Sequence, residues 1–202
     1  MLKHKIWLGT LIAGFDVPMQ MIDDINAIYD KHIDELPKHN HKLAGKIVDE
    51  HKIDHLIPDH HKYHFQSMFR TYLIEVEKLQ YDIKLNSAWV NEMRAGEYNP
   101  FHFHLGKTDL GLSSVLPLKI PKTYGKEVSI PEIPSNGNLE LIGGSQDLLG
   151  RNQLKTSVQV GQFYIFPYSL MHGVYPFYET DEKRRTLSYN CDLITRGRSS
   201  VG

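Results

Sequence analysis

The sequence predicts an α+β domain in which N-terminal helices pack on a jelly-roll barrel. In the first third of the chain, apolar residues recur at helical spacing. From about residue 85 onwards, short alternating segments are separated by turn residues. Helices followed by many short strands are typical of this architecture. Because 202 residues suffice for one well-cored domain, we expect a single domain over 1–202. Residues 1–85 should be mainly helical support, 86–195 the strand core, and 196–202 a flexible tail.

The composition excludes several classes of protein. Hydrophobic residues make up 41% and charged residues 23%, as in an ordinary globular chain, and the formal net charge is −1. Nothing in that charge favours nucleic acid or an anionic membrane surface. The single cysteine, Cys191, excludes an internal disulfide and fits a reducing compartment. The apolar run 6–15 has about half the length of a membrane span, so we expect an N-terminal strand and a cytoplasmic protein.

Two helices are expected before residue 85. Pro18 suits the first turn of a helix, with Asp16 as its candidate cap. The apolar stripe of this helix consists of Met21, Ile22, Ile25, Ile28 and Tyr29. A second helix is expected within 61–83. Its apolar face consists of Phe65, Met68, Phe69, Tyr72, Val76 and Leu79.

The polar stretch between these helices, residues 38–64, holds seven of the twelve histidines. They are interspersed with lysine and aspartate and lack a sustained helical or strand spacing. A solvated loop or helix face is therefore the favoured interpretation, with metal binding or pH sensing as the alternative.

The strand region begins with SAWVNEMR, residues 87–94. Its alternation places Trp89, Asn91 and Met93 on one face. Further along, prolines at 117, 121, 131 and 134 argue against a central strand. The segment 119–137 is long enough for a loop that covers a substrate.

The segment FHFH, residues 101–104, raises the possibility of a metal site. Residues i and i+2 of a strand project from the same face, so His102 and His104 should both point into the barrel, with Phe101 and Phe103 packing on its other face. A third histidine, His172, lies in the apolar segment FPYSLMHGVYPF. A buried imidazole needs a polar partner, and a metal ion is one such partner.

An arginine follows at the start of the strand RRTLSYN. By alternation, Arg184, Ser188 and Asn190 share a polar face that is suitable for lining a pocket. A guanidinium binds a carboxylate through two parallel hydrogen bonds, which lysine cannot provide. Arg184 is favoured for this role, and Arg185 remains the alternative.

These residues carry a resemblance. The order of two histidine segments and a late arginine resembles the Fe(II)/2-oxoglutarate-dependent dioxygenases. In particular, NPFHFHLGKTDLGLSSVLPL and GQFYIFPYSLMHGVYPF…EKRRTLSYN are similar to the ligand segments of prolyl-4-hydroxylase-like oxygenases of bacteria and marine phages. The resemblance covers roughly residues 86–195, whereas 1–85 is similar only in being helical.

The resemblance implies a double-stranded β-helix that binds Fe(II) and 2-oxoglutarate and hydroxylates a C–H bond while forming succinate and CO2. It implies that His102 and His172 are iron ligands and that Arg184 binds the distal carboxylate of 2-oxoglutarate. Asn91, Ser188 and Asn190 would hydrogen-bond the cosubstrate. The sequence departs from the family at His104, which stands where the family has a carboxylate ligand. His104 is favoured as the third metal ligand, and Asp109 is the nearest alternative carboxylate.

A second departure is Pro117, which lies in the strand where related enzymes often carry a tyrosine that contacts the cosubstrate. Two other functions remain open at this stage. One is a cupin-type metal enzyme with three histidine ligands, and the other is a non-catalytic β-helix that binds a ligand. The substrate, whether a small molecule or a peptide, and the oligomeric state do not follow from the sequence.

Overall fold

The computed structural model of the chain describes residues 2–7, 10–39, 45–104, 106–126, 135–144 and 152–196. Its two helices and eleven strands follow the order β1 (Leu2–Trp7), β2 (Leu11–Asp16), α1 (Met19–His32), β3 (Asp49–Lys52), α2 (Asp59–Glu75), β4 (Tyr81–Met93), β5 (Asn99–His102), β6 (Gly111–Lys119), β7 (Leu139–Ile142), β8 (Gln153–Thr156), β9 (Gln162–Pro167), β10 (Met171–Val174) and β11 (Arg184–Thr195).

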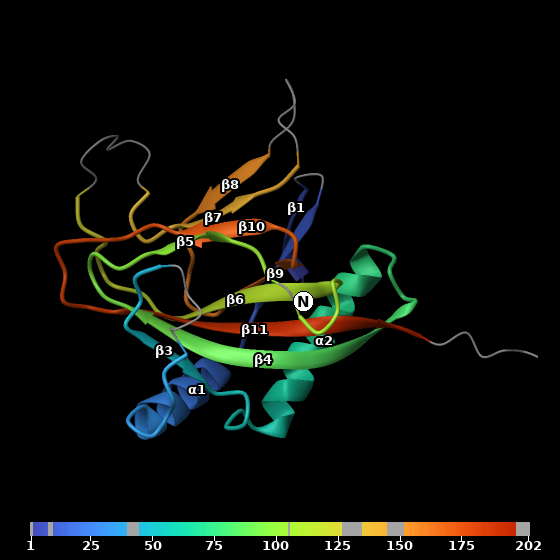
Figure 1. Cartoon of the computed structure of the whole chain (residues 1–202), viewed down its shortest axis with the longest axis horizontal. Helices are drawn as coiled ribbons and strands as arrows, with labels where there is room; N and C mark the ends of the chain where they lie inside the picture. The colour runs from blue at the N-terminus through green and yellow to red at the C-terminus, as the bar shows by residue number, and fades with distance from the viewer. Residues whose placement is uncertain are drawn as a thin grey trace, which may run out of the picture.

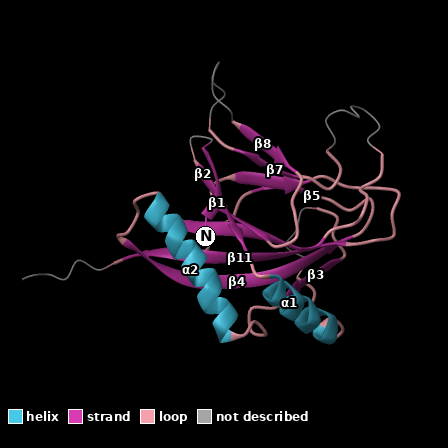
Figure 2. Ribbon diagram, turned by 180° about the vertical axis from the view of Figure 1, so that it is seen from behind, coloured by secondary structure: helices cyan, strands magenta, loops and turns pink. Residues whose placement is uncertain are grey.

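The strands form two antiparallel sheets. A seven-stranded sheet has the order β1-β2-β9-β6-β11-β4-β3, and a four-stranded sheet has the order β5-β10-β7-β8. The smaller sheet faces one side of the larger sheet, and both helices cover the opposite side (Figure 1). The view from behind shows α2 crossing β4 and β11, with α1 beside it (Figure 2). The expected combination of N-terminal helices with an antiparallel strand core is confirmed.

The larger sheet is apolar on both faces, and strand β9 illustrates why. Phe163 and Ile165 point into a core shared with the helices, whereas Tyr164 and Phe166 point into a second core between the two sheets. Successive side chains of a strand face opposite sides, so a continuous apolar run is needed where both sides are covered. The space between the sheets is therefore closed by packed side chains, except where polar residues line it.

Helix α1 forms as its apolar stripe predicts. Met21, Ile22, Ile25 and Tyr29 are buried against the sheet. The cap prediction was wrong, because the N-cap residue is Pro18, and Asp16 instead ends β2, where it pairs with Gln162. Proline fits a helix start because it lacks an N–H group that would need a partner.

Helix α2 is shorter than predicted. It ends at Glu75, and Leu79 is half exposed beyond it. The chain then turns, with Glu77 at φ 55°, and enters β4 at Tyr81, which pairs with Thr195 of β11. Pairing with a strand more than one hundred residues away therefore overrides the helical spacing that continues past residue 75.

The first 85 residues contain more strand than expected. β1 and β2 form a hairpin at one edge of the larger sheet, and β3 forms the other edge. The expected N-terminal strand is confirmed as this hairpin. None of the described helices is both long and apolar enough to cross a membrane, and the cytoplasmic location stays a prediction.

The prediction that Pro117 excludes a central strand was wrong. β6 lies between β9 and β11 and includes Pro117. The ladder to β9 covers only Leu112–Val115, and the pairing with β11 shifts its register beside Pro117. The missing N–H therefore falls where the ladders are interrupted, while the Pro117 carbonyl accepts a hydrogen bond from the Gly161 N–H at 3.1 Å.

Candidate functional site

The three predicted histidines lie together on the side of the smaller sheet that faces the larger sheet. His102 ends β5 and lies opposite His172 of β10 in the antiparallel pair. His104 lies two residues past the end of β5, where its N–H donates to the Tyr168 carbonyl at 3.0 Å. Ring centroids are 4.3 Å apart for His102 and His172 and 5.0 Å apart for each of the other two pairs. One ring nitrogen from each histidine lies within 4.8 Å of the other two.

Backbone carbonyls orient two of these rings. The Nδ1 of His102 lies 2.8 Å from the Pro100 carbonyl, and the Nδ1 of His172 lies 2.9 Å from the Leu170 carbonyl. A carbonyl only accepts, so each Nδ1 carries the proton and each Nε2 keeps a free lone pair. This is the tautomer that a metal-binding histidine needs.

The nitrogens are spaced as ligands of one ion. The Nε2 atoms of His104 and His172 are 3.2 Å apart. Two nitrogens at right angles, each about 2.1 Å from an ion, would be about 3 Å apart. Burial lowers the pKa of His102, His104 and His172, in the case of His104 to about 3. All three imidazoles are therefore neutral at physiological pH, as metal coordination requires.

The histidines line a cavity of about 370 Å³ between the two sheets. Trp89 and Asn91 of β4 and Ser188 and Asn190 of β11 line it from the larger sheet. The side-chain oxygens of Asn91 and Asn190 are buried, and no described residue forms a hydrogen bond with them. A buried acceptor without a partner is costly, so this wall is suited to a ligand that donates hydrogen bonds.

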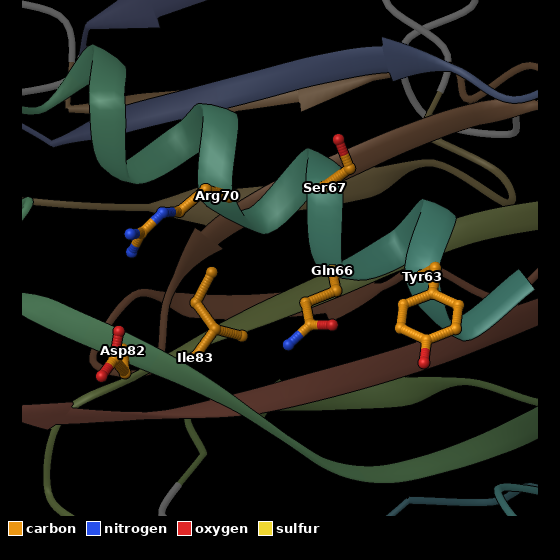
Figure 3. Close-up of a pocket in the computed structure, with 6 residues that line it drawn as sticks. All are labelled: Tyr63, Gln66, Ser67, Arg70, Asp82 and Ile83. Carbon is orange, nitrogen blue, oxygen red and sulfur yellow. The ribbon is translucent and has the colours of Figure 1, made fainter. Parts of the chain in front are cut away.

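A second and larger hollow, of about 500 Å³, lies between α2 and β4. Its lining consists of Tyr63, Gln66, Ser67, Arg70, Asp82 and Ile83 (Figure 3). Arg70 is already engaged there, because its Nη1 donates to the Tyr81 carbonyl at 2.9 Å. This hollow contains none of the predicted site residues, so the chemistry is expected in the histidine cavity.

Arg184 is the largest fully buried side chain among the described residues, at 1% exposure. Its Nε and Nη2 atoms have no hydrogen-bond partner among the described residues, and its Nη1 lies 4.0 Å from the Met93 sulfur. Tyr124 lies close enough for the guanidinium to oppose the burial that raises the pKa of its hydroxyl. A guanidinium stays charged in proteins, so its buried donors are suited to an anion.

Arg185 is in the opposite situation. Its Nε donates to Glu92 at 2.7 Å, its Nη1 to Asn26 at 3.0 Å and its Nη2 to Asp30 at 2.6 Å. The guanidinium also lies 4.5 Å from the centroid of the Tyr29 ring. Arg185 therefore joins α1 to the sheet, and each of its three guanidinium nitrogens already has a partner.

Asp109, Phe101 and Phe103 do not lie where the sequence analysis placed them or offered them. Asp109 is exposed and does not join the histidine group. Phe101 and Phe103 do not pack beneath the histidines as predicted, because they are 39% and 54% exposed. The smaller sheet has solvent on that side, which the alternation of FHFH alone does not reveal.

The polar histidine stretch is not wholly solvated. His51 is buried and lies 2.9 Å from the Tyr29 hydroxyl, and the buried His61 bonds Asp24 of α1. Two residues beside the site were missed, Glu50 and Tyr124. DEHK, residues 49–52, has no apolar residue and therefore no alternation that could have marked Glu50 as buried.

Comparisons with known proteins agree with this geometry. A family described as "Putative 2OG-Fe(II) oxygenase" matches residues 87–190, just over half of the chain. No curated protein matches the sequence. The fold and the histidine group therefore define the class as Fe(II)- and 2-oxoglutarate-dependent oxygenases. The chain belongs to this family, and it is an oxygenase of that class.

Solved structures share the fold at low sequence identity. A Pseudomonas putida prolyl-4-hydroxylase is 15% identical with a TM-score of 0.61, covering 92% of this chain and 93% of that one. A viral collagen prolyl hydroxylase from Paramecium Bursaria Chlorella virus-1, in complex with 2OG, is 13% identical with a TM-score of 0.59, covering 90% and 96%. An α-ketoglutarate-dependent epimerase from nogalamycin biosynthesis is 12% identical with a TM-score of 0.60, covering 94% and 82%. Family membership sets aside the cupin-type and non-catalytic alternatives.

Proposed function

We propose that this oxygenase hydroxylates a C–H bond of its substrate, with 2-oxoglutarate and O2 converted to succinate and CO2. One oxygen atom of O2 enters the new hydroxyl group, and the other enters succinate. The observation that carries this proposal is the unpaired, fully buried guanidinium of Arg184. It lies on the strand whose next inward residues line the three-histidine cavity.

We assign His102, His104 and His172 as the iron ligands. Their free Nε2 lone pairs, neutral charge and mutual spacing fit Fe(II), which imidazole ligands suit. The bound iron and 2-oxoglutarate would supply the oxidising chemistry, and the chain supplies orientation and a cavity that limits water. Three neutral ligands leave the metal one unit more positive than the common pair of histidines and one carboxylate, which would strengthen its hold on the anionic cosubstrate.

We assign Arg184 rather than Arg185 to the distal carboxylate of 2-oxoglutarate. The free Nε and Nη2 donors of Arg184 match the two oxygens of a carboxylate, whereas the donors of Arg185 are taken. Three further residues would contact the cosubstrate through their amide or hydroxyl groups. Ser188 and Asn190 line the cavity from β11, the strand of Arg184, and Asn91 lines it from the neighbouring strand β4.

We further infer that the two sheets form a double-stranded β-helix and that residues 1–202 make one domain. Support comes from one apolar core that includes residues of both the first 85 positions and the strand region. The substrate would be a small molecule or a peptide. Residues 119–126 and 135–137 belong to the expected covering loop, and the rest of that loop lies outside the described residues.

The test is an anaerobic titration with Fe(II) and then 2-oxoglutarate, which monitors the weak visible charge-transfer band of the chelated cosubstrate. We expect the band in the wild type, its loss in His102→Ala and His104→Ala, and a higher 2-oxoglutarate requirement in Arg184→Ala. Asp109→Ala is the matched control for the carboxylate alternative and should keep the band. A His104→Ala variant that kept the band while Asp109→Ala lost it would contradict the three-histidine assignment.

Hydroxylation itself is tested on substrates that stimulate succinate formation. The product should gain one oxygen atom, and under 18O2 the label should appear in both product and succinate. A product without added oxygen, as an epimerisation would give, would contradict hydroxylation but leave the iron and 2-oxoglutarate site intact.

A further inference from the structure

A second unpaired charge faces the histidine cavity. Glu50 belongs to β3, the strand at one end of the larger sheet, and it lies opposite Asn91 of β4, which in turn lies opposite Thr186 of β11. Residues opposite each other in neighbouring strands point to the same side of a sheet. All three residues line the cavity. With strands about 4.8 Å apart, Glu50 is about 10 Å from Thr186 across the sheet.

The Glu50 carboxyl group is buried, and one of its oxygens has no partner among the described residues. The residue is 2% exposed, and its Oε2 makes no hydrogen bond. Lys52, the next residue on that face of β3, pairs instead with Asp54 at 3.6 Å. Burial alone raises the pKa of the Glu50 carboxyl to about 7. A carboxylate in this position is destabilising in the free protein, and a cation or a strong donor would relieve the cost.

The cavity leaves few roles for this group other than substrate binding. The group of nearby metal-ligating atoms contains the three histidines and not Glu50. 2-Oxoglutarate carries two carboxylates of its own, which Glu50 would repel. Among the described lining residues Glu50 is the only one with a carboxyl group, and lysine and arginine do not occur among them.

The surroundings of Glu50 also suit a positively charged organic group. The unpaired Oδ1 of Asn91 lies on the neighbouring strand. Trp89 lines the same cavity, and its ring centroid is 5.6 Å from that of His104. An indole face attracts a cation and also packs against the methylene groups next to it.

We propose that Glu50 binds a cationic nitrogen of the primary substrate, so that the enzyme acts on an amine or guanidine compound or on a basic side chain. This inference rests on the proposed function, because it needs the cosubstrate at Arg184 and the metal at the histidines. Glu50 would then fix the substrate by its charge and determine which C–H bond approaches the metal. A neutral substrate of the same shape would leave the carboxylate unpaired and bind more weakly.

The test compares two probes of equal size, n-butylammonium and n-butanol, on protein loaded with Zn(II) and 2-oxoglutarate. Dissociation constants are measured by ligand-observed NMR. A charge-assisted hydrogen bond contributes about 1.5–3 kcal/mol, so the ammonium should bind at least about tenfold more tightly than the alcohol. Glu50→Gln should reduce this preference to within about twofold, with the alcohol bound as before.

Glu140→Gln is the matched control. Glu140 is also buried and unpaired, but it lies on β7 and does not line the cavity. It should keep both the preference and the visible Fe(II)–2-oxoglutarate band. Equal binding of the two probes to the wild type, or an undiminished preference in Glu50→Gln, would overturn the inference.

Loss of the band in Glu50→Gln would also overturn the inference, because Glu50 would then serve the metal or cosubstrate. The two proposals fail separately. A wild type without the band contradicts the proposed function, whereas a normal band without an ammonium preference contradicts only the role of Glu50.

Discussion

The two faces of the seven-stranded sheet differ in whether their buried charged side chains are paired. On the helix side, Arg185 lies opposite Glu92, and Glu92 lies opposite Asp49, so that one basic and two acidic side chains lie side by side across three strands. Each has a partner, since Arg185 also reaches Asp30 and Asp49 pairs with Arg94. On the opposite side, Arg184 and Glu50 are also buried, and within the described part of the chain the Nε and Nη2 of Arg184 and the Oε2 of Glu50 have no hydrogen-bond partner.

The difference separates structural charges from ligand-binding charges. A buried charge is tolerated in a stable fold when its partner is nearby, and it is costly when the partner is missing. The helix side therefore stabilises the protein by itself. In our proposals, the cavity side is destabilising until ligands of opposite charge bind, an anion at Arg184 and a cation at Glu50.

The largest expected effect is a loss of activity on removing one of the proposed metal ligands on the cavity side. His172→Ala removes one of three ligands and should lower succinate formation by about a thousandfold or more. Thermal stability of the metal-free protein should change little by comparison. The measurement is 2-oxoglutarate turnover at saturating Fe(II), and activity within tenfold of the wild type would contradict the ligand assignment.

The next largest effect should come from the helix side. Arg185→Met leaves Glu92 with Lys183 alone and Asp30 without its closer partner. Breaking a buried pair by removing one partner costs about 3–5 kcal/mol of unfolding free energy. Denaturant unfolding measures this loss. The dissociation constant of 2-oxoglutarate should stay within about twofold, and a large increase would mean that Arg185 contacts the cosubstrate.

Substituting Arg184 by methionine should instead weaken 2-oxoglutarate binding and leave the unfolding free energy intact. Arg184→Met removes two charged hydrogen bonds to the cosubstrate and should raise its dissociation constant about 100-fold. Unfolding free energy should stay unchanged or rise, because an unpaired buried cation is replaced by an apolar side chain of similar length. A loss of several kcal/mol with unaltered 2-oxoglutarate binding would make Arg184 structural.

The smallest effect concerns Glu50 and pH. Its pKa is raised to about 7 from 4.5, so the folded protein keeps a proton that the unfolded chain has released. Stability should therefore fall as pH rises from about 4.5 to 7 and level off above that. Glu50→Gln should remove this loss, raising the unfolding free energy by up to about 3 kcal/mol at pH 8 and hardly at all at pH 4. A variant that is less stable at pH 8 would show that the carboxylate has a partner in the free protein.

The convergence of the three histidines could be predicted from the sequence, because local spacing carries the information, and their role as ligands stays a prediction. His102, His104 and His172 stand out by their apolar surroundings, and alternation along RRTLSYN separates the faces of Arg184 and Arg185. The helical stripe from Met21 to Tyr29 and the strand from Trp89 to Met93 follow the same local rule. These features depend on side-chain periodicity, which a chain carries before it folds.

Only the tertiary structure decided the rest, because partners distant in sequence determine it. Pairing with β11 ends α2 at Glu75, and interrupted ladders admit Pro117 to a central strand. The fold determines whether a charged side chain pairs with a neighbouring residue or stays available to a ligand. Arg185 is paired because α1 supplies Asp30, whereas no described side chain of opposite charge pairs with Arg184 or Glu50. The sequence by itself determined which groups could do the chemistry, and the packing of two sheets and two helices determined which of them are free to do it.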